Sequence, residues 1–257
     1  MDSVRVQLCK HRGDYGFDGG RATIMELLAM GAAGFLLAGR AFVNARSRRV
    51  LVGIFELLGG LALLQALVSY LYSTRRGKFA FWAELLSSQP WRGDEHVLDM
   101  GCGRGAILGM VAKLLPRGRA VGLDLWRLED QSGNDPQATW RNLDLEGVRD
   151  RCELQTADMR AMPFPDATFD FVISSLAIHN IKGQKGRAEA IDEAVRVLKP
   201  GGRILIADIM WTKIYAARLR ERGMEDVIEQ RADWRLWYGT LGFVTGLVTA
   251  TKPTSLG

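Results

Sequence analysis

The stretch VLDMGCGRGAILG, residues 97–109, decides how the rest of this sequence is interpreted. Its first half is apolar and typical of a buried strand, and its glycines then lead into an apolar run of helical type. Turns of this kind commonly hold nucleotides, because backbone N–H groups at a helix N-terminus attract phosphate. Asp99, however, lies inside the turn and would repel a pyrophosphate. The stretch therefore predicts a nucleotide-like ligand that carries positive charge.

The composition of the chain is that of a folded protein rather than a disordered one. Of its 257 residues, 47% are hydrophobic and 25% are charged, and the formal net charge is +5. This modest basic excess fits either an ordinary solvated surface or attraction to an anionic membrane. No segment combines basic and aromatic residues in the manner of a nucleic-acid-binding module, so we expect no nucleic-acid partner.

Cysteine and histidine are too dispersed to build a metal site. The chain has three of each, and none shows the close spacing of zinc ligands. They are Cys9, Cys102, Cys152, His11, His96 and His179. We therefore expect no metal ion and no disulfide framework, as is usual in a reducing compartment.

Two long apolar runs precede the opening stretch, at residues 22–43 and 50–72. As helices, each would be about 33 Å long, which is close to the hydrocarbon thickness of a bilayer. We therefore predict a two-helix membrane hairpin over residues 22–76, inserted through residues 22–72 and preceded by an N-terminal segment, residues 1–21. The glycine-rich spacing would also suit a soluble hairpin buried in a homodimer, which stays open as the alternative.

The charges around the two runs bear on their orientation. The connecting loop, NARSRR at residues 44–49, is basic, but the two outer flanks together carry more lysine and arginine. Because positive charge is retained on the cytoplasmic side of a membrane, we predict that both ends of the hairpin and the following domain lie on that side. The basic loop leaves open a hairpin that enters one leaflet without crossing.

An amphipathic connector is expected at residues 77–89. Its aromatic residues, Phe79, Phe81 and Trp82, suit the headgroup level of a membrane or the surface of the following domain. In the first case the neighbouring basic residues would face anionic lipid. These are Arg75, Arg76 and Lys78.

From residue 90 to residue 257 the pattern changes to alternating strands and helices. Short apolar strands alternating with amphipathic helices predict a mostly parallel sheet covered on both faces. The candidate strands are residues 96–101, 118–125, 152–158, 169–176, 202–209 and 246–253. Ligands of such sheets bind beyond the carboxyl ends of the central strands, so the chemistry is expected there.

Three acidic residues follow three successive strands at this edge of the sheet. Asp99 lies in the glycine turn formed by Gly101, Gly103 and Gly105. Asp124 is placed to accept both hydroxyls of a ribose. After the next strand, Asp158 suits the amino group of an adenine, with Met159 beside the ring. Each acid taken singly also fits a surface residue or a helix cap, but together they indicate a nucleoside ligand.

Four ordered segments, VLDMGCGRG, VGLDL, TADMRAMPFPDATFDFVIS and EAVRVLKPGGRILIADI, resemble the motifs of class I S-adenosylmethionine-dependent methyltransferases. Within them the chain is most similar to the branch of ubiquinone and menaquinone biosynthesis. The resemblance covers about residues 90–210, and it implies a Rossmann-like, seven-stranded sheet. It also explains why the opening turn contains an acidic residue, because S-adenosylmethionine carries a sulfonium and an ammonium group and no pyrophosphate.

By this resemblance the turn at Asp99 holds the methionine part of the cofactor, Asp124 the ribose, and Asp158 with Met159 the adenine, while Trp126 would cover the adenine face. The cofactor-binding residues so implied are Asp99, Gly101, Cys102, Gly103, Gly105, Asp124, Leu125, Trp126, Asp158, Met159 and Ser174. The resemblance does not extend to the hairpin. Nor does it cover the irregular polar segment at residues 127–142, which is either a lid, an acceptor-binding loop or an ordinary surface loop.

Methyl transfer needs a general base only where the acceptor must lose a proton. His179, just after the fourth strand, is the first candidate, and Asp208 is the second; a packed pocket wall is the alternative role of His179. The aromatic tail is expected near the acceptor side, in the core or on a membrane. Its members are Trp234, Trp237, Tyr238 and Phe243.

Three functions remain in view. The leading prediction is a membrane-associated methyltransferase for a small hydrophobic or lipid-like acceptor, because the hairpin would place the pocket mouth at the lipid surface. The second is a methyltransferase for a small soluble nucleophile such as a thiol, with the hairpin as anchor or dimer contact. The third is a non-catalytic protein that binds the cofactor for assembly, which the full set of acids disfavours.

Overall fold

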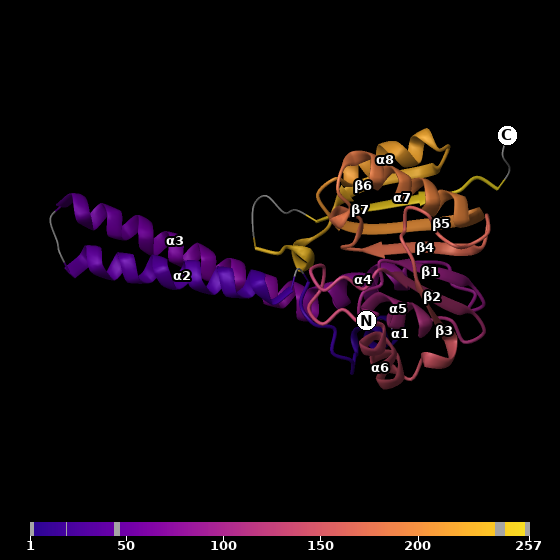
Figure 1. The fold of residues 1–257 in the computed structure, drawn as a ribbon, viewed down its shortest axis with the longest axis horizontal. Helices are drawn as coiled ribbons and strands as arrows, with labels where there is room; N and C mark the ends of the chain where they lie inside the picture. The colour runs from indigo at the N-terminus through magenta and orange to yellow at the C-terminus, as the bar shows by residue number, and fades with distance from the viewer. Residues whose placement is uncertain (1–2, 19, 44–46, 240–244, 255–257) are drawn as a thin grey trace.

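The computed structural model shows a long helical hairpin that projects from an α/β domain (Figure 1). It describes residues 3–18, 20–43, 47–239 and 245–254. The expected turn of the hairpin at residues 44–46, and Phe243 of the aromatic tail, lie outside the described residues.

Within the described residues, the domain is built on a seven-stranded sheet in the order β3-β2-β1-β4-β5-β7-β6. Strands β1 to β5 run parallel to one another, and β7 is antiparallel to both β5 and β6. The strands are His96–Met100 (β1), Arg119–Asp124 (β2), Cys152–Thr156 (β3), Phe169–Ser175 (β4), Leu198–Ile209 (β5), Glu225–Arg231 (β6) and Thr245–Thr251 (β7). The predicted mostly parallel sheet is confirmed. β6 is the strand that the pattern did not indicate, because its residues are polar and mostly exposed at the sheet edge.

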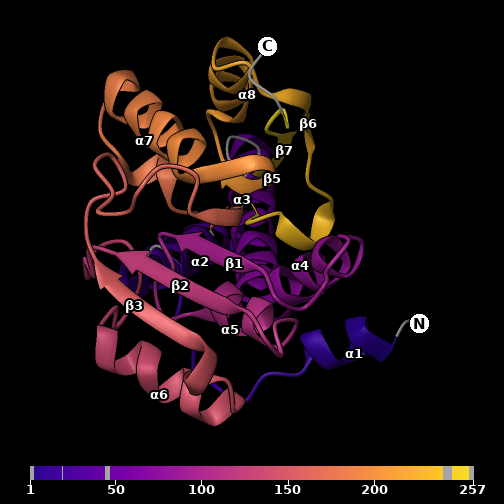
Figure 2. The same ribbon diagram turned by 90° about the vertical axis from the view of Figure 1, so that its right-hand side faces the viewer.

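Helices cover both faces of this sheet (Figure 2). α4, α5 and α6 contribute to the core on one face, and α7 and α8 to a second core on the other. The helices are Ser3–Cys9 (α1), Lys78–Ser87 (α4), Ala106–Ala112 (α5), Pro136–Glu146 (α6), Gln184–Val197 (α7) and Thr212–Glu221 (α8), with short 3-10 turns at Arg149–Arg151 (η2), Ile178–Asn180 (η3) and Trp234–Leu236 (η4). Two cores form because successive side chains of each strand point to opposite faces.

The polar segment at residues 127–142 was predicted to be irregular, but only its first part is irregular and the rest is helical. Helix α6 begins at Pro136, where the side chain of Asp135 accepts the N–H of Gln137 at 2.7 Å. An aspartate cap followed by proline at the first helical position is a strong helix start. The irregular part is therefore the loop at residues 127–135.

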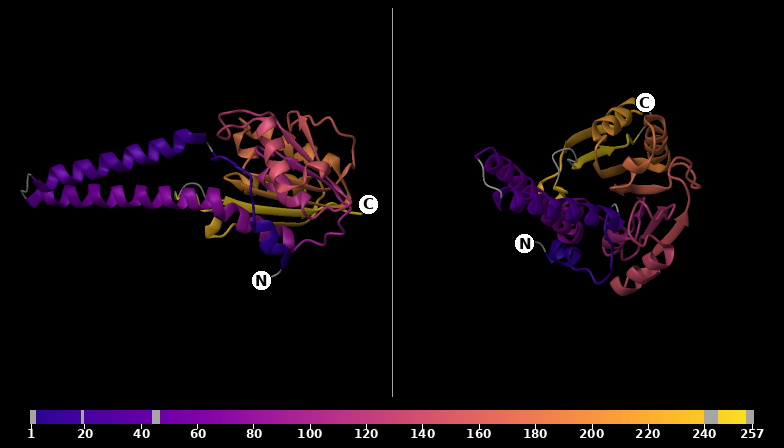
Figure 3. Two further views of the ribbon diagram at one scale, coloured as in Figure 1. Left: turned by 90° about the horizontal axis from the view of Figure 1, so that it is seen from below. Right: turned by 60° about the vertical axis from the view of Figure 1, so that its left-hand side comes forward.

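The hairpin consists of two antiparallel helices, α2 (Gly20–Val43) and α3 (Ser47–Tyr72), which lead away from the domain (Figure 3). The helices approach closely through glycine: a Cβ on Gly34 would lie 3.3 Å from the backbone of Gly60. α3 continues through a π-helical turn, Ser73–Gly77 (η1), into α4. The hairpin is thus joined to the domain by one continuous helical segment.

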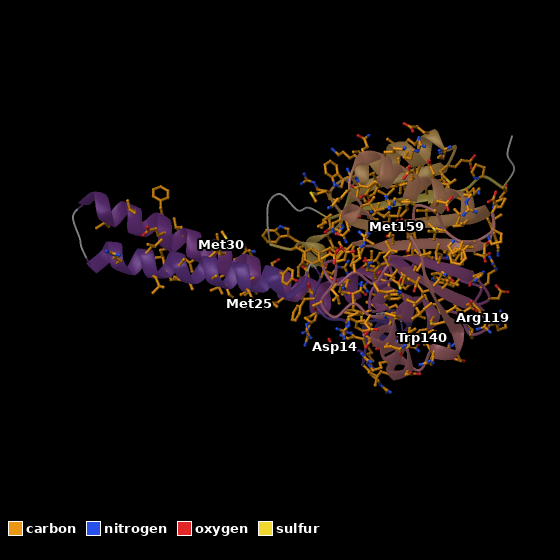
Figure 4. The ribbon with its side chains drawn as sticks, viewed as in Figure 1. Asp14, Met25, Met30, Arg119, Trp140 and Met159 are labelled. Carbon is orange, nitrogen blue, oxygen red and sulfur yellow. The ribbon has the colours of Figure 1, made fainter. Side chains whose placement is uncertain are left out.

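The outer surface of the hairpin is apolar, and the side chains of Met25 and Met30 can be located on α2 in Figure 4. Its exposed apolar residues include Met25, Leu28, Met30, Leu36, Leu37, Val52, Ile54, Phe55, Leu58, Leu61, Leu64 and Val68. Among the described residues, one helical stretch, Val52–Ser87, is long and apolar enough to span a membrane, and Leu28–Arg40 is a shorter apolar helix. Membrane insertion and homodimerisation of the hairpin remain predictions.

The connector α4 belongs to the domain rather than to a membrane surface. Phe79, Phe81 and Trp82 are buried in the core that contains α5, and the indole N–H of Trp82 donates to Oγ of Ser175 at 3.0 Å. Of the two roles that the sequence left open for these aromatics, packing on the domain is correct. Lys78 is also buried, so the expectation that it faces lipid is wrong.

Candidate active site

A cavity of about 610 Å³ lies at the carboxyl ends of β1, β2 and β4, where the sheet topology places ligands. The cavity is lined by the loops that follow the strands, by η3 and by residues at the root of the hairpin. One space therefore connects the predicted cofactor residues with the hairpin.

The turn after β1 brings bare backbone to the cavity. Gly101 and Gly103 line it with φ angles of +78° and +49°, a backbone region that favours glycine. A Cβ on Gly101 would lie 2.2 Å from the Cβ of Ala177, and one on Gly103 would lie 2.3 Å from Oε1 of Gln131. Gly105 does not line the cavity but starts α5 with φ of +80°. The structure thus gives Gly105 a role in starting the helix, and a contact with the cofactor stays a prediction.

Asp99 is a buried carboxyl group without a partner. It is 2% exposed, it lines the cavity, and neither side-chain oxygen makes a hydrogen bond within the described part of the chain. Burial raises the pKa of Asp99 to about 7; the charge of Asp124 adds to this effect and the ammonium of Lys78 opposes it weakly. A buried carboxylate without hydrogen bonds is costly unless a cation compensates it. Asp99 therefore fits a positively charged ligand.

Asp124 is held rigidly at the end of β2. Its Oδ2 accepts the N–H of Gly103 at 2.8 Å, and its Oδ1 accepts the N–H of Trp126 at 2.6 Å and the side-chain amide of Asn134 at 3.3 Å. A carboxylate has about four acceptor sites, so it retains the capacity to accept a hydroxyl from the cavity that it lines.

Asp158 and Met159 line the cavity after β3, and the position of Met159 within the domain can be seen in Figure 4. The guanidinium of Arg160 pairs with both oxygens of Asp158, with its Nε 3.0 Å from each, and this lowers the pKa of the carboxyl group. Met159 and Leu125 add apolar surface, and Cys102 lines the same cavity. The arrangement suits a flat, weakly polar ring with one amino group.

Two side chains assigned to the cofactor do not line this cavity. Trp126 donates its indole N–H to Oγ1 of Thr156 at 2.8 Å and borders a separate depression. Ser174 is fully buried and donates to the carbonyl of Met100 at 2.8 Å, which ties β4 to β1. Its neighbour Ser175 lines the cavity instead, because adjacent strand residues point to opposite faces.

His179, on η3, forms a dyad with Asp208. The Nδ1 of His179 lies 2.5 Å from Oδ1 of Asp208, and the backbone N–H of His179 donates to Oδ2 at 2.9 Å. Burial alone would lower the pKa of His179, but the charge and hydrogen bond of Asp208 outweigh it, so the pKa is raised. With Nδ1 engaged, Nε2 is the ring nitrogen available to a ligand.

Asp208 itself is 1% exposed and does not line the cavity. It also accepts the hydroxyl of Tyr215 at 3.3 Å. This position does not favour the predicted role of Asp208 as a second general base, since a base must reach the proton that it removes. Asp208 is a positioning residue for His179.

The N-terminal strap, which we define as residues 10–18, crosses the domain from α1 to the hairpin and pairs with the loop at 127–135. The N–H of Ser132 donates to the carbonyl of Phe17 at 3.1 Å, and the N–H of Phe17 donates to Oγ of Ser132 at 2.8 Å. Asp18 and Gln131 form an isolated antiparallel bridge. The loop thus lines the cavity and is more than an ordinary surface loop.

The cavity residues that were absent from the predicted site include four polar side chains from segments far apart in the sequence: Asp18, Tyr70, Lys78 and Tyr238. They come from the strap, from α3, from α4 and from the segment after η4. Only Tyr238 had a signal in the sequence, as part of the aromatic tail. The other three lie in segments without a motif, and only the closing of the hairpin at its root brings them together.

The donor set of the cavity fits S-adenosylmethionine. The unpartnered Asp99 suits the cationic methionine end, and Met159 with Leu125 offers apolar surface to the base. Asp124 already accepts three hydrogen bonds and keeps about one acceptor site for a ribose hydroxyl, rather than the capacity for both hydroxyls. The carboxylates that line the cavity after β1 and β2, Asp99 and Asp124, would repel a pyrophosphate.

Comparison with known proteins agrees with this site. Residues 98–206 match a family model described as a methyltransferase domain. The sterol 4-C-methyltransferase of Caenorhabditis elegans is 33% identical over 120 residues, which cover 47% of this chain and 33% of the relative. The demethylmenaquinone methyltransferase of Symbiobacterium thermophilum is 30% identical over 131 residues, which cover 50% and 49%. The chain spans about a third to a half of the length of these curated relatives.

Solved structures share the fold. A [4+2]-cyclase has a TM-score of 0.56 at 17% identity, with 69% of this chain and 83% of that chain covered. A methyltransferase of Aquifex aeolicus, described as dependent on S-adenosylmethionine, has a TM-score of 0.51 at 19% identity, with 66% and 88% covered. The family match and the relatives support the resemblance of this part of the chain to class I S-adenosylmethionine-dependent methyltransferases, and the solved structures share their fold. The matched region contains Asp99, Asp124, Asp158 and His179.

Proposed function

We propose that the protein transfers the methyl group of S-adenosylmethionine to a small hydrophobic or lipid-like acceptor at a membrane. The observation that carries the proposal is the shared cavity: Asp99 and Asp124 line it together with Tyr70, at the root of the apolar hairpin. A cofactor and an acceptor that approached from the hairpin would meet in this space. His179 lines the same cavity.

When bound, S-adenosylmethionine supplies a methyl group on a sulfonium sulfur, which leaves with the C–S electron pair as the acceptor bonds to the methyl carbon. Asp99 would hold the cationic end and Asp124 the ribose. Nε2 of His179 takes the proton that the acceptor loses, while Asp208 holds Nδ1–H and stabilises the charge that develops on the ring. The surrounding burial excludes water from the transfer.

The acceptor class is supported by the relatives. Their names specify methylation of a sterol and of demethylmenaquinone, both of which are apolar molecules of the membrane. The exposed apolar residues of the hairpin, with Leu36 and Phe55 each 75% exposed, support attachment to such a membrane. Both ends of the hairpin carry basic residues, which favours the cytoplasmic side for the domain.

The test is incubation of the purified protein with methyl-labelled S-adenosylmethionine and the membrane lipids of its host, followed by partition of the products. We expect label in the organic phase, and no label with Asp124→Ala, whose affinity for the cofactor should fall about tenfold or more. Label confined to water-soluble or volatile products would favour a small soluble nucleophile. Cofactor binding without any labelled product would favour a non-catalytic role.

A further inference from the structure

A polar cluster lies at the root of the hairpin, outside the residues matched by the family model. The Nζ of Lys78 lies 2.8 and 3.0 Å from the two carboxylate oxygens of Asp18. The hydroxyl of Tyr238 donates to Oδ2 of Asp18 at 3.1 Å, and the hydroxyl of Tyr70 donates to the backbone carbonyl of Asp18. All four residues line the cavity that contains His179. The cluster is therefore a wall of the candidate active site as well as a fastening of the hairpin.

The chemistry that this wall offers to a ligand follows from its internal bonds. The ammonium of Lys78 and the carboxylate of Asp18 have side chains that are 4% and 18% exposed, and their charges cancel. Burial raises the pKa of Tyr238 well above its ordinary value, so its hydroxyl stays protonated and keeps its lone pairs for a further donor. Lys78 has three N–H groups, of which two are directed at Asp18. The wall thus presents a donor and an acceptor without net charge.

We propose that Asp18, Lys78 and Tyr238 recognise the polar end of the acceptor, and that this end is a neutral hydroxyl group. The inference rests on the proposed function and assigns the acceptor end of its cavity. A hydroxyl group can donate one hydrogen bond and accept another. It therefore matches the hydroxyl oxygen of Tyr238, which can accept, and the third N–H of Lys78, which can donate. A carboxylate or an ammonium would bring an uncompensated charge into a buried site.

The remainder of the acceptor is apolar by the same reasoning. Beside the cluster the cavity is lined by the apolar residues Leu176, Ile181 and Ile209. Val68, two residues before Tyr70 on α3, is 59% exposed and begins the apolar surface of the hairpin. The acceptor is thus an amphiphile whose hydroxyl lies at the inner wall and whose hydrocarbon part leads toward the hairpin.

The experiment measures binding of two probes rather than turnover. The full chain in detergent is titrated with a prenylated hydroquinone and with the same molecule in which both hydroxyls are replaced by hydrogen, with and without S-adenosylhomocysteine. We expect the hydroquinone to bind about tenfold or more tightly than the deoxy probe, since a site built for a hydroxyl rejects the analogue that lacks it. Tyr238→Phe and Asp18→Asn should reduce this preference to about threefold or less.

Two controls separate recognition from a merely structural role. S-adenosylhomocysteine should bind both variants within about twofold of the unaltered protein, and Tyr72→Phe, which removes a hydroxyl outside the cavity, should keep the full preference. If Asp18→Asn fails to fold, Tyr238→Phe carries the test.

Equal binding of the two probes to the unaltered protein overturns the inference. So does a Tyr238→Phe variant that weakens both probes and S-adenosylhomocysteine alike. A protein that prefers the hydroquinone but binds no S-adenosylhomocysteine would keep the recognition site and overturn the methyltransferase proposal instead.

Discussion

The α/β domain and the hairpin both contain many large apolar side chains, but the side chains are buried in the domain and exposed on the hairpin. In the domain, Trp82 and Phe169 are completely buried, and two cores enclose both faces of the sheet. In the hairpin, Leu36 and Phe55 are three-quarters exposed. The apolar side chains of the domain are buried by other parts of the chain, whereas those on the outer surface of the hairpin are not buried by any of the described residues. The cofactor part of the proposed function therefore rests on the domain, and its membrane part rests on the hairpin.

The largest expected effect tests this contrast through two aromatic truncations. Trp82→Ala should lower the free energy of unfolding by about 3–5 kcal/mol, because it leaves a cavity in the core. Phe55→Ala should change it by no more than about 0.5 kcal/mol. Chemical denaturation of the detergent-solubilised protein measures both. Similar losses for the two variants would mean that the hairpin surface is covered in solution, for instance in a dimer.

The next effect concerns the domain alone. His179→Ala should reduce kcat by about 100-fold or more, because the acceptor proton loses its base, while the Kd of the cofactor should stay within about twofold. Asp208→Asn should also reduce kcat, because the amide no longer fixes the charged ring. Steady-state kinetics with calorimetry separates the two quantities. Unchanged turnover of His179→Ala would make His179 a pocket wall only.

A pH dependence of cofactor binding follows from Asp99. The pKa of Asp99 is about 7 without ligand, and we expect a cationic ligand to bind only when this carboxyl group is ionised. Affinity should therefore rise with pH, by about tenfold per unit below pH 7, and level off above it. Calorimetry in two buffers of different ionisation enthalpy should show proton release below pH 7. Asp99→Asn should bind weakly and without this dependence; a wild-type affinity independent of pH would contradict the role of Asp99.

The smallest expected effect concerns the contribution of two basic residues at the root of the hairpin to membrane binding. Arg75 and Arg76 are exposed at its root, in the π-helical turn before α4. Changing either to Gln should weaken binding to vesicles that contain anionic lipid by about fivefold, since each basic residue near such a surface contributes about 1 kcal/mol. Binding to neutral vesicles should not change. Lys185→Gln, at a highly exposed site on α7, is the matched control. Equal effects of all three changes would remove Arg75 and Arg76 from the interface.

The sheet and the cofactor end of the cavity were predictable because their signals are local. The glycine turn, the acids at three strand ends and the alternation of strands and helices are each contained in short segments. The helix start at Asp135 and Pro136 was also readable, yet polarity of the surrounding segment concealed it. Ser174 shows the limit of such reading, because a shift of one residue decides whether Ser174 or Ser175 faces the cavity.

The acceptor end was not predictable for a different reason. Lys78 and Asp18 are 60 residues apart in the chain, and Tyr238 lies a further 160 residues on. An amphipathic segment such as α4 shows which face is apolar but not what covers that face. The aromatic residues of α4 therefore suited a membrane surface as well as the core, until the packing of Trp82 against β4 decided between them.

The N-terminal strap has a consequence for the order in which the molecule assembles. Phe17 bonds to Ser132 across 115 residues of chain, and Asp14 bonds to Asn142 across 128. Because synthesis proceeds from the N-terminus at several residues per second, the strap and the hairpin leave the ribosome well before the surfaces that they dock on exist. The hairpin is therefore fully made while the sheet is still missing, and the last strand, β7, completes the sheet from the opposite end of the chain. The cavity is thus closed late in biogenesis, by segments that were synthesised first.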